Sequence, residues 1–287
     1  SPTATAGRRT MAQVADGPAG FANCLKFTTT TADTSIAATE KLFLQQKFEG
    51  QDLQQLQKGT ATAKQFTVSF YVKGNAAAIY SVELKDADNN RINTQSFAVT
   101  TAWNRIELTF AGDTTGALDD DNAESLAINI WLHGGSNFTG GTYASNTWAS
   151  TTDANRYAVA DRTSIFDATS RTFFITGVQM ELGDTATEFE HRSYGEELAL
   201  CQRYYQETRA GWSGDSTDNE FYRAHYQLPV TMRAAPTIVW ADVNVAGFDG
   251  AYSSESTTVN GGAVYRQANT TANGRLLTVS GKFTSEL

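Results

Sequence analysis

The chain has few cysteines, few prolines and no long apolar run. Its 287 residues include four prolines and two cysteines, Cys24 and Cys201. Cysteines so far apart are not the framework of a small secreted domain, so we expect free thiols, with a bridge as the alternative. No apolar stretch approaches the roughly 18 residues of a membrane helix, and no hydrophobic segment marks a signal peptide. We therefore expect no membrane insertion.

Positive charge is also scarce and is not clustered. The sequence holds 22 Lys and Arg against 31 Asp and Glu, for a net charge of −9. Proteins that bind nucleic acid need grouped cations to displace counterions from the phosphates, and no such group occurs here. We therefore expect no nucleic-acid partner. The chain begins at Ser1 without an initiator Met, which we interpret as the start of a fragment or of a processed form.

Catalytic and metal-binding motifs are absent as well. The three histidines, His133, His191 and His225, lie far apart and form no metal-binding array, so they are interpreted as structural or solvated. No G-x-S-x-G motif occurs. The triplet 214–216 places a serine after an aspartate, but no histidine follows His225 to serve as its base. We predict no catalytic residue, no metal site and no cofactor, and hence no enzyme.

Two acidic stretches deserve a separate interpretation because jelly-roll lectins often hold Ca²⁺. Residues 119–121 are three aspartates, and residues 86–90 are rich in Asp and Asn. Carboxylate and amide oxygens are ligands that Ca²⁺ prefers. The simpler interpretation, which we favour, is a solvated acidic loop at 119–121 and an Asx-rich hairpin turn at 86–90.

What the sequence does contain favours β-structure. Aromatic residues make up 11% of the chain, and Thr and aromatic side chains suit pleated surfaces, while Gly and Asn suit turns. In the segment 66–72, apolar side chains occupy every second position, as expected for a strand with one buried face. The same analysis predicts eight strands without intervening helices, which indicates an all-β jelly-roll sandwich. The predicted strands are 21–29, 39–49, 65–73, 77–85, 91–99, 103–110, 125–132 and 171–182.

One segment has helical periodicity. Ser193 and Glu196 have the spacing of a capping box. Apolar residues then recur at intervals of four, three and four, which places them on one helical face. That face either packs onto the sandwich or forms a short coiled-coil seam between copies of the chain. We assign it to oligomerisation: Tyr194, Leu198, Cys201 and Tyr205.

The segments predict four parts along the chain. A lead-in segment with little regular structure spans 1–20, and the jelly-roll, lectin-like sandwich spans 21–190. A connecting helix spans 191–210, and a smaller C-terminal β tip domain spans 211–287. Strands of the tip are predicted at 221–228, 237–246, 262–267 and 276–283. A unit of this size gains stability by packing against copies of itself.

A long Gly-, Ser- and Asn-rich segment, 133–157, carries several aromatic residues. Sugars stack on aromatic rings while amides and guanidinium groups bond their hydroxyls. The segment is therefore a candidate glycan site, although its aromatics could instead fold onto the sandwich or onto a neighbouring subunit. The candidate glycan-binding residues are Trp131, Asn137, Phe138, Tyr143, Trp148 and Arg156.

The most specific signature in the chain consists of residues 174–183, 187–192 and 195–205. These stretches resemble phage tail-fibre and virion appendage proteins that carry a carbohydrate-binding-like jelly-roll sandwich. Residues 46–50 and 68–74 resemble the same sandwich. Residues 228–237 and 285–287 resemble the C-terminal tip. The resemblance implies a virion surface appendage that assembles in the host cytoplasm as a homotrimer, with other virion proteins and a host surface glycan as partners. No catalytic motif carries over.

The sequence thus favours a structural phage protein that mediates attachment to host surface glycans. Two alternatives stay open. One is a purely structural fibre or capsid decoration protein without a ligand. The other is a polysaccharide depolymerase, which would need two carboxylates facing each other across a groove.

Overall fold

The computed structural model describes residues 7–287, with the backbone alone at residues 249, 250, 273, 274 and 276. Strands dominate, and the chain divides into two compact units, Ser1–Glu190 and His191–Leu287. Each unit is described by itself below. No helix within the described residues is long and apolar enough to cross a bilayer. Both cysteines are free thiols, as the sequence predicts.

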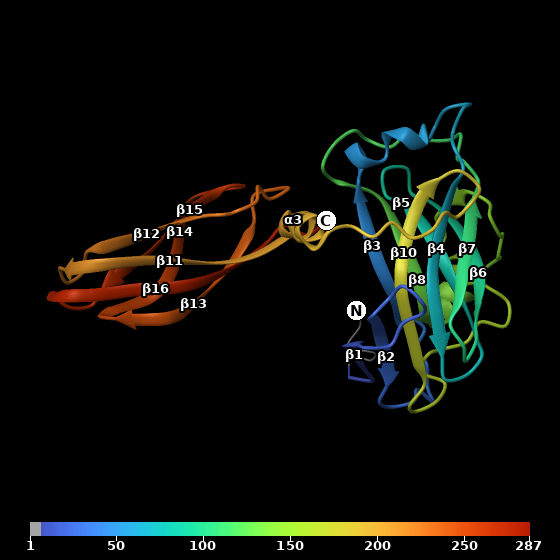
Figure 1. Cartoon of the computed structure of the whole chain (residues 1–287), viewed down its shortest axis with the longest axis horizontal. Helices are drawn as coiled ribbons and strands as arrows, with labels where there is room; N and C mark the ends of the chain where they lie inside the picture. The colour runs from blue at the N-terminus through green and yellow to red at the C-terminus, as the bar shows by residue number, and fades with distance from the viewer. Residues whose placement is uncertain (1–6) are drawn as a thin grey trace. The chain divides into compact units, whose positions relative to one another are not determined.

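The first unit is an antiparallel jelly-roll sandwich, as predicted, but it has ten strands in two five-stranded sheets where eight strands were predicted (Figure 1). One sheet has the order β1-β2-β10-β4-β7, and the other has the order β3-β8-β5-β6-β9. Within each sheet every neighbouring pair is antiparallel. The strands are β1 (Arg9–Val14), β2 (Cys24–Thr29), β3 (Lys41–Glu49), β4 (Phe66–Gly74), β5 (Ala78–Asp86), β6 (Arg91–Val99), β7 (Asn104–Phe110), β8 (Glu124–Gly134), β9 (Ala149–Ser150) and β10 (Thr172–Leu182).

Alternating apolar residues explain how the two sheets pack. In β4 the side chains of Phe66, Val68, Phe70 and Val72 are all buried, and they belong to one continuous core with residues of both sheets. The predicted hairpin joins β5 and β6, and its turn ends at Asn90, which has a left-handed backbone (φ 52°). Short helical segments occur only outside the strands: η1 (Gly50–Asp52), η2 (Gln54–Leu56), α2 (Ser136–Thr139) and η3 (Asp153–Asn155).

Strand β8 is buried on both of its faces. Every residue from Ser125 to His133 is buried, including the polar ones. One face contributes to the sandwich core. The other face is covered by the segment between β8 and β10: Tyr157 stacks on Trp131 at 5.7 Å, and Phe138 lies 5.5 Å from the same ring. Both faces of the sheet that contains β8 are therefore buried at the centre of the sheet.

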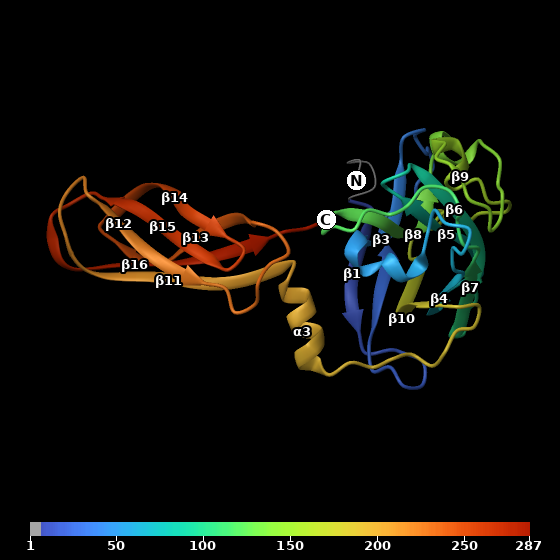
Figure 2. The same ribbon diagram turned by 90° about the horizontal axis from the view of Figure 1, so that it is seen from above.

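The C-terminal unit consists of a helix and two three-stranded antiparallel sheets, with the orders β11-β16-β13 and β12-β15-β14. Aromatic residues form much of its core, in which Phe283 contacts Tyr226 and Trp240. Figure 2 shows α3 as a short helix before β11 that lies outside both sheets of this unit. The elements are α3 (Tyr194–Gln202), β11 (Tyr205–Ser216), β12 (Phe221–Gln227), β13 (Thr237–Ala246), β14 (Phe248–Thr258), β15 (Gly261–Ala268) and β16 (Ala272–Thr284).

Three sequence predictions need correction. The lead-in segment is not irregular throughout, because β1 pairs with β2 at the sheet edge; its residues 1–6 lie outside the described residues. The helix ends at Gln202 rather than at 210, because burial alternates with period two from Tyr205 onward and forms β11. Strand β14 was not predicted at all.

Candidate functional site

The predicted glycan residues Trp131 and Phe138 lie in the interior. Trp131 is fully buried and Phe138 is 7% exposed. Their rings pack on each other and on Phe43 and Tyr157. A sugar needs an open ring face to stack on, and neither residue offers one. These two assignments are therefore corrected: both rings hold the covering segment on the sheet.

Arg156 is also buried, and its guanidinium group is already paired. Its Nε and Nη2 donate to the two carboxylate oxygens of Glu83 at 2.7 and 3.1 Å. Glu83 further accepts from Asn129 Nδ2 at 2.9 Å and from Trp131 Nε1 at 2.8 Å. Burial disfavours the charged guanidinium, but Glu83 outweighs it and raises the pKa of Arg156. Arg156 therefore fixes the covering segment instead of reaching a ligand.

The remaining predicted glycan residues lie apart from one another. The Tyr143 hydroxyl accepts from the backbone N–H of Ser96 at 3.0 Å, on β6. Trp148 is half-buried, and its Nε1 donates to the carbonyl of Ala111 at 2.7 Å. Asn137 is exposed on α2. The structure thus does not gather the six residues into one surface, and the aromatics fold onto their own sandwich, which was the alternative interpretation.

A surface groove of about 660 Å³ lies at one end of the sandwich, where η2 leads towards β4 and where β10 ends. The two walls are joined by a hydrogen bond from the N–H of Gly183 to the carbonyl of Gln65 at 3.0 Å. Most lining residues are exposed and polar. They are Gln55, Gln57, Thr62, Ala63, Lys64, Gln65, Leu182, Gly183 and Asp184.

The groove contains polar groups that are not used within the chain. Among the described residues no hydrogen bond engages the side-chain amides of Gln57 and Gln65 or the ammonium group of Lys64, whereas Gln55 Nε2 donates to the carbonyl of Asp52 at 2.9 Å. An amide group carries both donors and an acceptor, as a sugar hydroxyl requires of its partners. A second hollow of about 320 Å³ continues from this groove and shares Gln57 and Thr62 with it.

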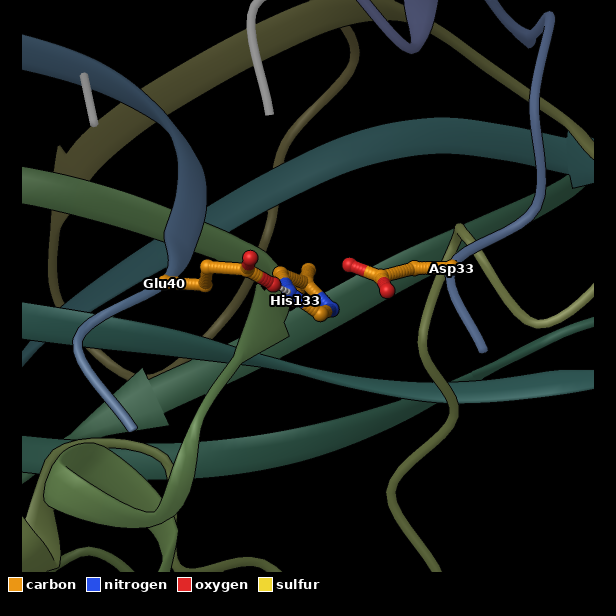
Figure 3. Close-up of side chains that lie close together, drawn as sticks. All are labelled: Asp33, Glu40 and His133. Carbon is orange, nitrogen blue, oxygen red and sulfur yellow. Dashed lines mark hydrogen bonds and ion pairs between the residues drawn. The ribbon is translucent and has the colours of Figure 1, made fainter. Parts of the chain in front are cut away.

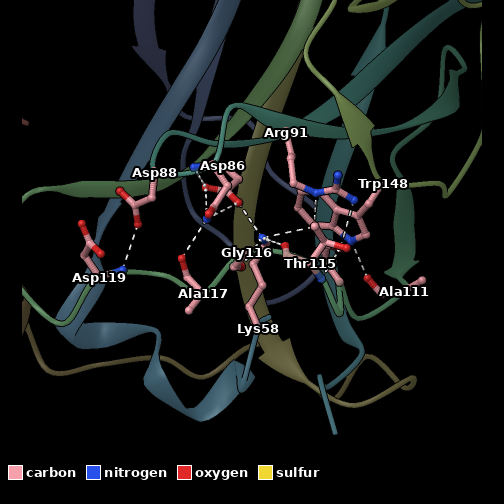
Figure 4. A network of polar contacts seen from close by, with 12 residues as sticks. Lys58, Asp86, Asp88, Arg91, Ala111, Thr115, Gly116, Ala117, Asp119 and Trp148 are labelled. Atoms are coloured by element: carbon pink, nitrogen blue, oxygen red, sulfur yellow. Dashed lines mark hydrogen bonds and ion pairs between the residues drawn. The ribbon is translucent and has the colours of Figure 1, made fainter. Parts of the chain in front are cut away.

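A buried ion-pair network supports the loop beside the groove (Figure 4). Lys58 Nζ lies 2.5 Å from Asp86 Oδ2 and 3.1 Å from Asp113 Oδ2, and it also donates to the carbonyls of Thr115 and Gly116. Burial would raise the pKa of Asp113, but hydrogen bonds from Arg91, the Thr115 N–H and Lys58 lower it. The network joins the ends of several loops at Lys58 and so fixes the position of the backbone at residues 57–62.

The turn itself is set by the backbone at Gln57. This residue adopts a left-handed conformation (φ 51°), and its carbonyl accepts from Thr60 Oγ1 at 2.7 Å. Asp86 also caps the β5–β6 turn, because its Oδ1 accepts from the N–H of Asn89 at 2.9 Å. This is the Asx-rich hairpin turn that the sequence predicts at 86–90, and Asp86 points to Lys58 in Figure 4.

A group of aromatic rings lies on the outer face of the sheet β1-β2-β10-β4-β7. Phe21 packs against Tyr71 at 5.3 Å, and Lys73 lies over the rings of Trp103 and Phe174 at 5.2 and 4.9 Å. These half-buried rings contact each other and neighbouring cations, which is the packing of a small satellite core. The sequence analysis did not identify these aromatic residues. It also missed the groove residues, because they come from two segments that are more than a hundred positions apart.

The predicted oligomerisation residues are exposed but belong to two elements. Tyr194, Leu198 and Cys201 lie on α3, whereas Tyr205 begins β11. The exposed fractions are 82% for Tyr194, 40% for Leu198 and 43% for Tyr205. The predicted capping box is present, with the Ser193 side chain and Glu196 bonded reciprocally. No residue of α3 is buried in the single chain.

Comparisons with known proteins find similarity in structure only. No family model matches the sequence, and no curated protein matches it. The CBM22-1 xylan-binding domain of Paenibacillus barcinonensis Xyn10C is 15% identical, over 63% of this chain and 85% of that domain, with a TM-score of 0.30. A family 11 carbohydrate-binding module from Clostridium thermocellum is also 15% identical, over 62% and 85% of the two chains, with a TM-score of 0.31. Discoidin II of Dictyostelium discoideum is 9% identical, over 92% and 77% of the two chains, with a TM-score of 0.24.

Proposed function

We propose that this chain is a non-enzymatic appendage protein of a phage virion, which attaches to host surface glycans through the groove at the end of its sandwich. The observation that carries the glycan part is the groove of about 660 Å³ with its exposed amide, hydroxyl, ammonium and carboxylate groups. Its volume lies within the range of about 300–1,000 Å³ that is usual for small-ligand sites. The groove would accept one or two sugar residues of a longer glycan.

The chemistry of the groove suits hydroxyl groups rather than a charged ligand. Lys64 and Asp184 carry opposite charges, and the amides of Gln57 and Gln65 are neutral. Leu182 is 48% exposed and offers an apolar patch for the C–H face of a ring. No aromatic side chain lines the groove, so binding at a single site would be weak. A homotrimer would present three grooves, and multivalent attachment gains avidity from that.

The non-enzymatic part of the proposal rests on the carboxylates. Glycoside hydrolysis needs two of them across a groove, about 5–10 Å apart. The groove residues include a single carboxylate, Asp184. Glu181, close to it in sequence, accepts hydrogen bonds from the N–H and the hydroxyl of Thr187, which lower its pKa against the effect of burial. Glu181 is therefore an anion that fixes a loop, which does not suit a general acid.

The virion part rests on the resemblance of residues 174–205 to tail-fibre and appendage proteins. The proposed location is the virion surface after assembly in the host cytoplasm, and two free thiols suit folding in a reducing compartment. The proposed homotrimer is joined through α3 and the C-terminal unit. Exposed apolar side chains on these elements support it: Tyr194, Leu198, Leu200, Phe221, Val239 and Val243.

A glycan array probed with the full-length protein tests the proposal. We expect binding to a subset of bacterial surface glycans, and a Gln57→Ala/Gln65→Ala variant should lose about tenfold or more in affinity because two hydrogen-bonding amides are removed. Both side chains are exposed, so the melting temperature should stay unchanged. Asn137→Ala is the matched control, since it removes an exposed amide outside the groove.

Each outcome of the array decides between the alternatives. Binding that is lost in Asn137→Ala and kept in the groove variant would move the site to the segment that covers β8. A wild-type protein that binds no glycan would leave the purely structural fibre or decoration protein. Release of reducing ends from a bound polysaccharide would establish the depolymerase.

A further inference from the structure

Three buried side chains with metal-ligating atoms meet in the sandwich, away from the glycan groove (Figure 3). Asp33 lies in the connection between β2 and β3, Glu40 directly precedes β3, and His133 lies near the end of β8. Their exposed fractions are 9%, 3% and 0%. One ligand atom from each lies within 4.8 Å of the other two. In Figure 3 both carboxylates point towards the imidazole ring between them.

One atom of this cluster is buried without a hydrogen-bond partner. Asp33 Oδ1 accepts from the N–H of Ser35 at 3.0 Å and lies 3.6 Å from the Arg8 guanidinium. Asp33 Oδ2 accepts from no N–H or hydroxyl group among the described residues, although the side chain is 0% exposed. Its neighbour is the Glu40 carboxyl group, which could bond it only by carrying a proton. A buried carboxylate oxygen without a donor costs free energy, and it costs more when it is charged. A positive group placed between the three side chains would remove this cost.

The histidine is held in the orientation of a ligand. His133 Nδ1 lies 2.7 Å from Ser164 Oγ, which fixes the ring, and Nε2 faces Glu40 Oε2 at 3.4 Å. A charged hydrogen bond from imidazolium to carboxylate is normally about 2.7–2.9 Å long, so this spacing is long for an ion pair. A metal-bound histidine usually donates its other ring N–H to an acceptor that fixes its tautomer and orientation, and Ser164 Oγ is placed to accept that N–H here.

The charged side chains of the cluster also suit a cation. Two carboxylates and one imidazole, all buried, lie within 4.8 Å of one another. Arg8 lies on the other side of Asp33, 3.6 Å from Oδ1. A proton shared between the carboxylates or a metal ion placed between them would each offset the repulsion of the two anions.

We propose that Asp33, Glu40 and His133 bind a structural divalent metal ion, with Zn²⁺ as the best fit. Imidazole nitrogen and carboxylate oxygen are both ligands of Zn²⁺, whereas Ca²⁺ takes six to eight oxygens and no imidazole. Two ligands about 2.0–2.1 Å from a tetrahedral zinc are about 3.3–3.4 Å apart, and Nε2 and Oε2 are 3.4 Å apart. Asp33 supplies the third bond from a carboxylate oxygen that lies within 4.8 Å of the other two ligand atoms, and the second oxygen of Glu40 or a water molecule completes the shell.

The ion would join three segments that are distant in sequence. The N–H of Asp33 donates to the carbonyl of Phe166 at 2.8 Å, and Ser164 Oγ accepts from the N–H of Phe166 at 3.0 Å. The β2–β3 connection, the end of β8 and the covering segment at 164–166 thus meet at the cluster. Because all three ligands come together only in the folded sandwich, metal binding stabilises the folded state by mass action.

The test uses the full-length protein after removal of metal with a chelator. Adding Zn²⁺ should give one ion per chain in the native mass spectrum and raise the melting temperature of the sandwich by several degrees. Glu40→Gln should bind Zn²⁺ at least about 100-fold more weakly, because a neutral amide replaces a charged ligand. His225→Gln, which removes an exposed histidine of the C-terminal unit, is the control for adventitious binding and should behave as the wild type.

Glu40→Gln also distinguishes a bound metal ion from a proton on Glu40. If a proton on Glu40 holds the cluster together, glutamine imitates it, so Glu40→Gln would melt at or above the wild type and Zn²⁺ would shift neither protein. That result overturns the proposal, as does a Ca²⁺ response without a Zn²⁺ response. Should Glu40→Gln fail to fold, Co²⁺ added to the wild type decides: a tetrahedral nitrogen–oxygen site gives strong visible absorption bands, and their absence rules the site out.

Discussion

The two units of this chain differ in how completely they bury their own strands. In the sandwich, β8 is covered on both faces, by the opposite sheet and by the segment between β8 and β10. In the C-terminal unit, no residue of β13 is buried, and Val239 on its outer face is 64% exposed. A small unit buries a smaller fraction of its unfolded surface than a large one does. The centre of the sandwich is thus covered within the chain, whereas β13 is not, and the proposed association of the C-terminal unit would account for this difference.

Replacing a buried phenylalanine by alanine in the core of either unit should have the largest effect on stability. Each substitution should destabilise only the unit that contains it. Phe70 and Phe283 are both fully buried, each against other aromatic rings. Phe→Ala at either site should cost about 3–5 kcal/mol of the free energy of unfolding of its own unit. Urea unfolding followed by near-ultraviolet circular dichroism should show two transitions, of which Phe70→Ala shifts one and Phe283→Ala the other. A single substitution that shifts both transitions would show that the units unfold together.

Removing one partner of an ion pair should lower the stability of the sandwich, where the pair is buried, but not that of the C-terminal unit, where the pair is exposed. Arg156→Met leaves Glu83 buried and uncompensated, since both partners lie in the interior of the sandwich. Loss of one partner of a buried pair costs about 3–5 kcal/mol. Arg223 and Glu255 of the C-terminal unit are paired with side chains 50% and 45% exposed, so Arg223→Met should cause no resolvable change in the urea midpoint.

A double variant checks the physical reason for this effect. Glu83→Gln/Arg156→Met removes both charges at once, so it should recover a large part of the stability that Arg156→Met loses. A double variant as unstable as the single one would mean that packing of the Arg156 side chain, rather than the uncompensated charge, sets the cost.

Exposed valines offer a closely matched test of association. Val178 of the sandwich and Val243 of the C-terminal unit are each 44% exposed, and each lies at a register shift in its strand. Val243→Asp should convert a species of three chains into single chains, because a charge is placed in the proposed interface. Val178→Asp should leave the trimer intact. Native mass spectrometry at micromolar concentration measures both, and a wild type that is already monomeric would end the trimer proposal.

The sequence predicts the sandwich well because its signal is local. The alternation at 66–72 defines β4, and the turn at 86–90 defines the β5–β6 hairpin. β1 was missed because it is an edge strand with four of its six residues exposed, so its sequence has no alternation to detect. The helix was extended too far because Tyr205 continues the helical spacing of Leu198 and Cys201, although the chain there already alternates as β11.

The sites were harder to predict than the strands, for a different physical reason. An aromatic residue such as Trp131 has the same sequence context whether its ring faces solvent or an overlying segment, and only packing decides that it is buried. Asp33 and His133 are a hundred positions apart, so no spacing pattern reveals that they meet. His133 is buried and bonded to Ser164, in agreement with its interpretation as a structural residue, and the proposed metal site would add a ligand role.

The smallest expected effect is on the reaction rates of the two thiols. Cys24 reports on the sandwich, and Cys201 reports on the C-terminal unit. Burial raises the pKa of Cys24, the Asp16 charge adds to this, and the residue is buried at the start of β2. Cys201 is exposed on α3 in the single chain. Because the thiolate is the reactive form, Cys24 should react with an aromatic disulfide reagent only after unfolding, and denatured protein should show two thiols in total.

Cys201 then reports on the proposed trimer. Its reaction should be slow in the wild type, where neighbouring copies cover α3, and fast in Val243→Asp, which exposes the helix again. The slow reaction of Cys24 should be the same in both proteins, because dissociation does not open the sandwich. Equal rates for Cys201 in the two proteins would place α3 outside the interface and leave the C-terminal sheets alone to join the copies. A rate for Cys24 that rises with dissociation would instead show that the sandwich is not complete without its partners.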